Sequence, residues 1–334
     1  MKTVVSAKEV QELIRQGGDL RSLPADALFT PLARELLRDA KSVVQRPPAA
    51  ALPAGGQAER VFNSPEAHAF KTQICDIGRR LWSRAYVDGN GGNISVRLGE
   101  DWVLCTPTLI SKGFMKPEDL CLVDLEGNQK AGTRQRTSEI LLHLDIMKKQ
   151  PKALSVVHCH PPHATAFAVA GVTPPTCMIP EIEVFIGEVP IAPYSTPGTA
   201  ELSRRVADLV DQHNTILMAN HGVVAWSHSI EDAYFKMEIL EAYCRTVVVA
   251  AQLGAGFKTF TPTQLGDLLE VKKKLGIPDR RIGLKECELC DNSEWHPGMT
   301  CVAPAPGSAS APLDPQAEVL VQSLTEAIIA KMKG

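Results

Sequence analysis

The stretch "LSVVHCHPPHATA", residues 154–166, carries three histidines directly behind a short apolar run. The run "LSVV" predicts the start of a buried β-strand. Alternate residues of a strand point to the same face, so His158 and His160 are expected side by side at its end. Neutral imidazole is a favoured ligand of zinc. The spacing by itself leaves two interpretations open, a metal site or a pair of ordinary hydrogen-bonded histidines.

A third histidine lies in "ANHGVVAW", residues 219–226. His221 follows one apolar run and precedes Gly222, a residue that allows backbone to approach closely. Two histidines from one strand and one from a distant strand match a three-ligand catalytic zinc site with an open position. Taken alone, His221 is more simply explained as a core or loop histidine.

The composition is that of an ordinary globular protein. The chain has 334 residues, of which 44% are hydrophobic and 22% charged, and its net charge of −3 favours neither nucleic acid nor a membrane as a partner. Nine cysteines, most of them single in apolar surroundings, indicate a reducing compartment and therefore the cytoplasm. We identify no signal peptide and no apolar window long enough to span a bilayer.

Composition also predicts the domain organisation. Two stretches rich in Pro, Ala and Gly are typical of linkers, and the last segment places Leu320, Leu324, Ile328 and Met332 near one helical face. The expected parts are a helical segment at 1–45, a linker at 46–63, a catalytic domain at 64–285, a Cys/His-containing loop at 286–302, a linker at 303–315 and an amphipathic helix at 316–334.

Within the body, strands and helices interleave irregularly, which predicts an α/β layered domain with a mixed or antiparallel sheet. Ser64 and Pro65 are expected to start a helix that runs to about Trp82. Further helices are expected at 136–150, capped by Thr137 or Ser138, and at 229–254. Strands are expected in 88–98, 101–108, 154–160 and 215–227.

Two polar motifs are candidate anion sites. The glycines of "GNGGN", residues 89–93, form either a tight turn or a cradle of backbone N–H groups. Thr137 and Ser138 at a helix N-terminus suit an anion, although they are also ordinary caps. Glu139 beside them could simply stabilise the helix dipole.

The order of the motifs identifies a resemblance. "GNGGNISVR", "LCTPT", "RTSE", "VVHCHPPHATA", "VPIAPYSTPGT" and "MANHGVVAWSHSIEDAYFKMEILE" follow one another as in the class II aldolase/adducin family, over roughly residues 65–260. The resemblance implies a three-layer α/β/α sandwich around a mixed, largely antiparallel sheet. It also implies a homotetramer with active sites near subunit interfaces.

The resemblance further implies a role for each matched residue. His158, His160 and His221 would bind a catalytic Zn²⁺, and Glu139 would move a proton. The sugar phosphate would be bound by Gly92, Asn93, Thr108, Thr137 and Ser138. The implied reaction is zinc-dependent retro-aldol cleavage of a ketose 1-phosphate, of the L-fuculose or L-rhamnulose type, to dihydroxyacetone phosphate and L-lactaldehyde.

The chain departs from the family pattern at two places. Leu109 stands where the family has glycine, which changes the shape of the pocket. Ile179 lies near the position of a family tyrosine that protonates the leaving aldehyde. Glu181, Glu183, a neighbouring subunit or the C-terminal region could supply that proton, although each glutamate is more simply explained as a solvated residue.

Other activities remain open. Sugar-phosphate 4-epimerases of the family typically have aspartate where this chain has Glu139, which favours aldol cleavage. Decarboxylases and dehydratases of the family share the zinc site. A non-enzymatic, adducin-like scaffold would lack the three histidines that are present here.

The C-terminal segments raise two further expectations. Cys287, Cys290, His296 and Cys301 are compatible with a second metal site, a structural zinc or an iron–sulfur cluster, or else with free thiols. Residues 316–334 resemble the encapsulation peptides of bacterial microcompartment cargo enzymes, which implies a shell protein as partner. A helix docked on the oligomer's own surface is the alternative.

Overall fold

The computed structural model describes residues 56–284 and, before them, only positions 4, 5, 9, 10, 13, 23, 27–29 and 33. The predicted Cys/His loop, the linker at 303–315 and the terminal helix lie outside the described residues, as does most of the predicted helical segment at 1–45. The chain divides into two units, 1–60 and 61–334. In the first unit, β1 (Val4–Val5) pairs in parallel with β2 (Leu28–Phe29).

Helix α3 (Gln57–Phe62) lies inside the segment 46–63 that composition predicted to be a linker. The Pro/Ala/Gly-rich stretch ends at Gly56, and the residues that follow, "QAER", are good helix formers. The linker prediction was therefore wrong for residues 57–62.

The two long helices begin and end where the sequence predicts. Helix α4 (Pro65–Ser83) starts after Ser64, whose hydroxyl accepts a hydrogen bond of 3.1 Å from the backbone N–H of Ala67. Helix α9 (Ile230–Gln252) starts after Ser229, which caps the N–H of Asp232 in the same way. Gly254 follows the end of α9 with φ of +67°, a conformation that glycine adopts at little cost.

One mixed sheet of eight strands forms the centre of the described body, in the order β6-β5-β4-β3-β7-β10-β9-β8. All neighbouring strands are antiparallel except β8 and β9, which are parallel. The strands are β3 (Asn93–Leu98), β4 (Trp102–Cys105), β5 (Cys121–Asp124), β6 (Gln129–Ala131), β7 (Ser155–Cys159), β8 (Ile191–Ala192), β9 (Thr215–Met218) and β10 (Gly222–Ser227). The predicted mixed, largely antiparallel sheet is confirmed.

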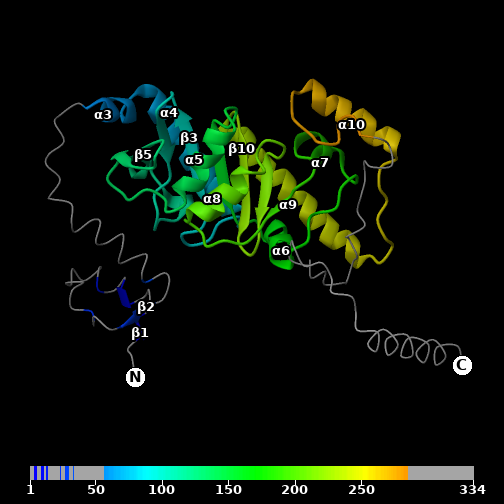
Figure 1. Cartoon of the computed structure of the whole chain (residues 1–334), viewed down its shortest axis with the longest axis horizontal. Helices are drawn as coiled ribbons and strands as arrows, with labels where there is room; N and C mark the ends of the chain where they lie inside the picture. The colour runs from blue at the N-terminus through cyan, green and yellow to red at the C-terminus, as the bar shows by residue number, and fades with distance from the viewer. Residues whose placement is uncertain are drawn as a thin grey trace, which may run out of the picture. The chain divides into compact units, whose positions relative to one another are not determined.

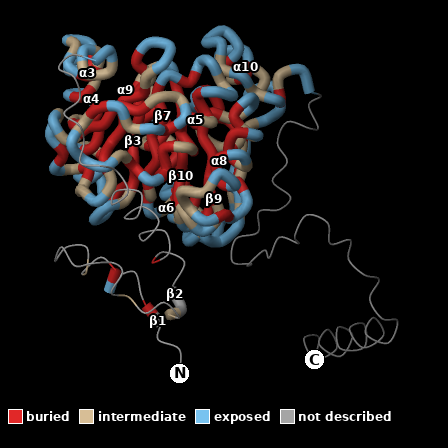
Figure 2. The backbone as a smooth tube through the Cα atoms, turned by 60° about the vertical axis from the view of Figure 1, so that its left-hand side comes forward, coloured by how far each residue is buried: buried red, intermediate tan, exposed pale blue. Residues whose placement is uncertain are grey.

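Helices cover both faces of this sheet, which gives three layers (Figure 1). Helices α5 (Ile140–Lys149) and α8 (Ala200–Ala207) share one buried cluster with residues of β4, β7, β9 and β10. Helices α4, α6 (Pro162–Ala170) and α9 contact the sheet as a separate group. Residues buried between the layers run along β3, β7 and β10 (Figure 2). The α/β/α sandwich expected from the resemblance is confirmed.

The stretch 215–227 forms a hairpin, with β9 and β10 antiparallel and Gly222 opposite Met218. The turn between them contains Asn220 in the left-handed region, with φ of +54°, a conformation that asparagine tolerates. His221 therefore lies in the turn that joins β9 to β10, at the end of these two strands.

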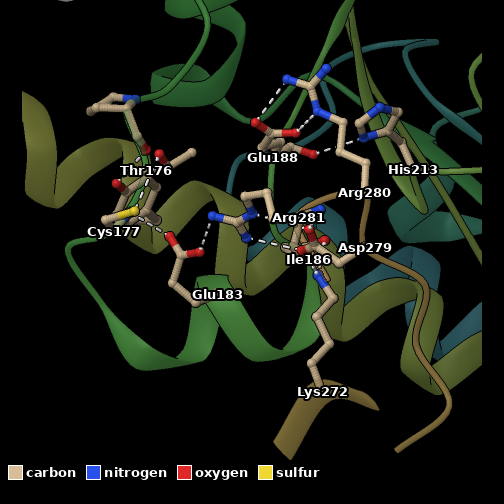
Figure 3. Close-up of polar contacts among 12 residues, drawn as sticks. Thr176, Cys177, Glu183, Ile186, Glu188, His213, Lys272, Asp279, Arg280 and Arg281 are labelled. Atoms are coloured by element: carbon tan, nitrogen blue, oxygen red, sulfur yellow. Dashed lines mark hydrogen bonds and ion pairs between the residues drawn. The ribbon is translucent and has the colours of Figure 1, made fainter. Parts of the chain in front are cut away.

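Helices α7 (Pro180–Phe185) and α10 (Pro262–Lys274) lie side by side at one end of the body (Figure 1). A buried ion cluster made by Glu183, Lys272, Asp279 and Arg281 holds this end together (Figure 3). Two short 3₁₀ helices, η2 (Lys112–Phe114) and η3 (Pro117–Asp119), precede β5. None of the helices in the described part of the chain combines the length and apolar character needed to cross a bilayer.

Candidate active site

Strand pairing brings the three predicted metal-binding histidines together. His158 is the penultimate residue of β7 and His160 directly follows the strand, while His221 lies in the turn before β10, the strand that pairs with β7. The Nε2 atoms of His158 and His160 are 3.1 Å apart. One nitrogen of each of the three rings lies within 4.8 Å of the others. His158 and His221 are about 60 residues apart in the sequence, and the antiparallel pairing of β7 with β10 brings them together.

The surroundings of the histidines leave them neutral and directed at one point. Nδ1 of His158 donates a hydrogen bond of 2.8 Å to the carbonyl of Val223, so its Nε2 presents a lone pair to the other two rings. Burial lowers the pKa of His158 well below its usual value and that of His160 to about 4. Burial also lowers the pKa of His221, against the opposing effect of Glu139. Neutral imidazoles are the form that a metal ion requires.

Only glycine fits at position 222, because the histidine cluster leaves no room for a side chain there. A Cβ atom added there would lie 2.5 Å from Cδ2 of His160 and 2.7 Å from the carbonyl oxygen of Cys159. No side chain fits without moving the His160 ring. The expected close approach of backbone at Gly222 is therefore confirmed.

Glu139 lies directly opposite the histidines. The predicted caps Thr137 and Ser138 are one or two residues too early, because α5 begins at Ile140 and Glu139 occupies the N-cap position without a side-chain capping bond. Its carboxylate turns toward the histidines, 3.5 Å from Nε2 of His158 and 3.7 Å from Nε2 of His221. Helix α5 thus begins later than predicted and has no side-chain cap. The carboxylate of Glu139 therefore points to the histidines instead of capping the helix.

A chain of hydrogen bonds fixes the Glu139 carboxylate. Asn93 donates from Nδ2 to Oε2 of Glu139 at 2.7 Å, and its Oδ1 accepts from Nε2 of His143. Nδ1 of His143 then accepts from the hydroxyl of Ser95 at 2.7 Å. Burial lowers the pKa of His143 to about 3, so the ring is neutral and this assignment of donors is consistent.

His143 and Ser95 were missed by the sequence analysis. A signal for His143 was present, because it lies four residues after Glu139 and therefore on the same face of α5. Ser95 shares a strand face with Asn93, two residues earlier. Both positions follow from the periodicity of their elements.

A cavity of about 360 Å³ adjoins the histidines and Glu139. All five residues expected to bind the phosphate line it, and His160 lines it too. Its lining residues are Asp88, Asn90, Gly91, Gly92, Asn93, Pro107, Thr108, Lys112, Thr137, Ser138, Glu139, His160 and Pro197. The "GNGGN" loop, the "TPT" segment and the start of α5, far apart in the chain, meet around this one cavity.

The two glutamates considered as proton donors do not line the cavity. Glu183 has no exposed side-chain surface, and its Oε2 lies 2.7 Å from NH1 of Arg281 while its Oε1 accepts from the N–H of Cys177 (Figure 3). Glu181 is exposed in the first turn of α7. The interpretation of Glu183 as a solvated residue or a proton donor was wrong, because it is the buried partner of an arginine.

Leu109, which stands where the resemblance places a glycine, has a backbone conformation that glycine adopts at little cost. Its φ is +56°, in the left-handed region, and its side chain is 65% exposed. The neighbouring Thr108 lines the cavity.

The residues of this cluster fit a zinc ion. Ligands arranged tetrahedrally at usual Zn–N distances are separated by roughly 3.3 Å, close to the spacing of the His158 and His160 nitrogens. Oε1 of Glu139 and Nδ1 of His221 are buried and have no hydrogen-bond partner among the described residues. In the described part of the chain, these histidines form the one group able to hold a metal. Cys287, Cys290, His296 and Cys301 lie outside it.

Comparison with known proteins identifies relatives of the body. Residues 72–248, more than half of the chain, match the family described as class II aldolase and adducin N-terminal domain. An L-fuculose phosphate aldolase of Methanococcus maripaludis is 36% identical over 170 residues, which cover 51% of this chain and 91% of the relative.

Two further relatives widen the range of reactions. A 3-oxo-tetronate 4-phosphate decarboxylase of Cupriavidus necator is 34% identical and matches 51% of this chain and 80% of its own length. The solved structure of YgbL from Klebsiella pneumoniae, titled as an aldolase, epimerase or decarboxylase, is 28% identical with a TM-score of 0.56, covering 60% of this chain and 97% of that one.

Proposed function

Because the chain belongs to the class II aldolase and adducin family, we propose that it is a zinc-dependent enzyme that cleaves a ketose 1-phosphate. The expected substrates are of the L-fuculose or L-rhamnulose type, and the products are dihydroxyacetone phosphate and L-lactaldehyde. The observation that carries this proposal is the group of three neutral histidines facing Glu139 beside a cavity of loop amides and hydroxyls.

Zinc held by His158, His160 and His221 would act as a Lewis acid for the negative charge that develops on the substrate oxygens during cleavage. A side chain of the protein would transfer the proton that the cleavage reaction requires. Glu139 is the carboxylate nearest to the histidines, and it would return a proton to the carbon that becomes C1 of dihydroxyacetone phosphate. Asn93 donates a hydrogen bond to one oxygen of Glu139, and the other oxygen has no partner among the described residues and would be free to transfer the proton.

The remaining lining residues would bind the phosphate. Thr108, Thr137, Ser138 and Gly92, which come from three separate segments of the chain, all line the cavity. Hydroxyls and amide groups of this kind bind phosphate oxygens, and the energy of that remote contact orients the reacting carbon. Glu139 and the proposed phosphate-binding residues thus line the same cavity, the former for proton transfer and the latter for binding.

A second candidate is a decarboxylase acting on a 3-oxo-tetronate 4-phosphate. The decarboxylase of Cupriavidus necator is nearly as similar as the aldolase, and both reactions place negative charge on a carbon next to a carbonyl. The same histidines, carboxylate and phosphate subsite would serve either reaction. The choice depends on whether an aldehyde or carbon dioxide leaves.

One experiment separates these candidates. The zinc-loaded chain is incubated with L-fuculose 1-phosphate, L-rhamnulose 1-phosphate, L-ribulose 5-phosphate and a 3-oxo-tetronate 4-phosphate, while release of dihydroxyacetone phosphate and of carbon dioxide is followed. The proposal expects dihydroxyacetone phosphate from at least one of the first two. Carbon dioxide from the last alone would establish the second candidate. His160→Ala should lose bound zinc and activity together, with exposed His68→Ala as control.

The expected assembly is a homotetramer in the cytoplasm, and residues 316–334 would bring it to a microcompartment shell. Trp82 and Phe114 support a subunit contact, since both are exposed and their rings pack edge to face with centroids 5.0 Å apart. No tyrosine lines the cavity in the described part of the chain. The group that protonates the leaving aldehyde would then come from a neighbouring subunit or the C-terminal region.

A further inference from the structure

Lys112 is a buried cation at the cavity that neither the motifs nor the proposed reaction uses. It opens η2, is 1% exposed and is one of the residues that line the cavity. Nζ donates hydrogen bonds to the carbonyls of Ile110 at 2.8 Å and Asn90 at 3.2 Å. Asn90 belongs to the "GNGGN" loop and Ile110 follows the "TPT" segment, and both segments contribute lining residues, so the ammonium group connects two parts of the cavity wall.

Within the described part of the chain, the charge of Lys112 has no carboxylate partner. Among the described residues no Asp or Glu oxygen lies within 4.0 Å of its Nζ, whereas the buried Lys236 and Lys272 each pair with an aspartate. A buried cation is costly without a counter-charge. Burial accordingly lowers the pKa of Lys112 to about 8, against the opposing effect of Glu139, so the side chain is still mainly charged at pH 7.

The position of Lys112 is set by packing. The backbone of α4 comes so close at Gly78 that an added Cβ atom would collide with the carbonyl oxygen of Lys112. The two carbonyl acceptors take two of the three N–H groups of the ammonium, which leaves one donor. Lys112 is the one lysine or arginine among the lining residues of the cavity in the described body. The cavity therefore holds a fixed positive charge before any substrate arrives.

We propose that Lys112 binds the anionic group of the substrate and makes the cavity selective for phosphorylated substrates. This assignment rests on the proposed function, since it takes the substrate to be a sugar phosphate. A fixed ammonium adds a charge-assisted hydrogen bond to the neutral donors at Gly92, Thr108, Thr137 and Ser138. Substrates that lack the phosphate would leave the cation without a counter-charge.

A purely structural role is the alternative, in which Lys112 only ties the two loops together. Lys112→Gln separates the two roles, because its amide keeps N–H donors for the loop carbonyls but carries no charge. Lys112→Met removes both. The control is Lys148→Gln, which removes an exposed lysine of α5 that does not line the cavity.

The test measures binding of inorganic phosphate to the zinc-loaded full chain by calorimetry. We expect the Kd to rise about 10- to 100-fold in Lys112→Gln and Lys112→Met, the usual size of a hydrogen bond to a charged group. Lys148→Gln should bind phosphate like the unmodified chain. Unchanged affinity in Lys112→Gln, or no phosphate binding by the unmodified chain, would overturn the proposal.

A second measurement needs no variant. Acetylation by acetic anhydride, read by mass spectrometry, should slow several-fold at Lys112 when phosphate is saturating and stay unchanged at Lys148. Equal labelling of Lys112 with and without phosphate would overturn the proposal. Failure to cleave any of the ketose phosphates would overturn the proposed function alone. The two measurements with inorganic phosphate would still decide whether Lys112 binds an anion.

Discussion

At the scale of single residues, the candidate site depends on how one carboxylate is held. One carboxylate oxygen of Glu139 accepts a hydrogen bond from the amide of Asn93. That amide is hydrogen-bonded to His143, and His143 is hydrogen-bonded to Ser95. The second oxygen of Glu139 faces the histidines without a partner among the described residues. Three side chains thus fix this carboxylate, and among the described residues only its second oxygen is left without a hydrogen-bond partner.

Glu139→Gln should therefore remove the proton-transfer step and leave the rest of the site in place. We expect bound zinc and the thermal midpoint to be retained, and exchange of the C1 proton of dihydroxyacetone phosphate with solvent to fall about 100-fold or more. Deuterium incorporation followed by NMR measures the exchange. Exposed Glu118→Gln is the control. Exchange at the normal rate in Glu139→Gln would rule out this role.

Leu109 is a residue in an unfavourable conformation. A left-handed backbone costs a residue with a Cβ roughly 1–2 kcal/mol, while glycine adopts it freely and loses somewhat more entropy on folding. Leu109→Gly should raise the free energy of unfolding by up to about 1 kcal/mol, because the strain relieved exceeds the entropy lost. Urea denaturation measures the change. A loss of stability would mean that the exposed leucine side chain has a contact that compensates for the strain.

At the scale of elements, the end of the body depends on buried charges. Arg281 joins α7 to the segment after α10, because it pairs with Glu183 on one side and Asp279 on the other, and Lys272 of α10 pairs with the same Asp279 (Figure 3). All four side chains are at most 3% exposed. Removing one member leaves its partner as an uncompensated charge inside the protein.

Arg281→Met should consequently destabilise the chain by about 3–5 kcal/mol, because Glu183 would remain buried without its partner. The neighbouring Arg280 provides a matched control. Its side chain is 60% exposed and pairs at the surface with Glu188, so Arg280→Met should cost less than about 1 kcal/mol. Thermal and urea unfolding of both variants measure the difference. Equal effects would show that the buried cluster contributes no more than a surface pair.

At the scale of the whole molecule, buried imidazoles set the response to acid. His143 has a pKa lowered to about 3 by burial, below the value of about 6.5 for an unfolded histidine. Its contribution to stability is complete above pH 6.5 and is lost as the pH falls toward 3, because the unfolded state then binds the proton more readily. Asp279, whose pKa is lowered by Arg281 and Lys272 against its burial, contributes above about pH 4 and loses its contribution below.

The free energy of unfolding should therefore begin to fall below pH 6.5. From His143 alone we expect a loss of about 2 kcal/mol between pH 8 and pH 5. Urea denaturation at a series of pH values, in the presence of a chelator, measures this loss. A constant free energy down to pH 5 would contradict the assigned neutral state of His143.

The catalytic body should function without the C-terminal segment. All residues assigned to the site lie between Asp88 and His221, and relatives with the same family domain match about half of this chain. Deleting residues 316–334 should leave cleavage activity and the thermal midpoint unchanged. Fusing the same residues to a reporter should confer binding to shell proteins. A drop of several degrees in the truncated chain would instead assign the segment to the fold.

Much of the fold was predictable because local chemistry decides it. Ser64 and Ser229 before good helix formers mark the starts of α4 and α9, and Gly254 marks an end. The apolar run before His158 predicts β7. The order of separated motifs predicted the family and the mixed sheet. Local reasoning failed at 57–62, where the composition of a longer stretch outweighed four helix-forming residues, and at the start of α5, where tertiary contacts of Glu139 displaced the expected cap.

The sequence by itself determined the family, the layered sheet and the residue types of the candidate site, since these depend on periodicity and on motifs within a few residues. The tertiary structure alone decided which of those residues meet. It placed His221 beside His158 through the register of β7 and β10, connected His143 to Glu139 through Asn93, buried Glu183 against Arg281 and left Lys112 charged at the cavity. The physical reason is that burial and partner charge are properties of a packed interior, formed by elements that are distant in the chain.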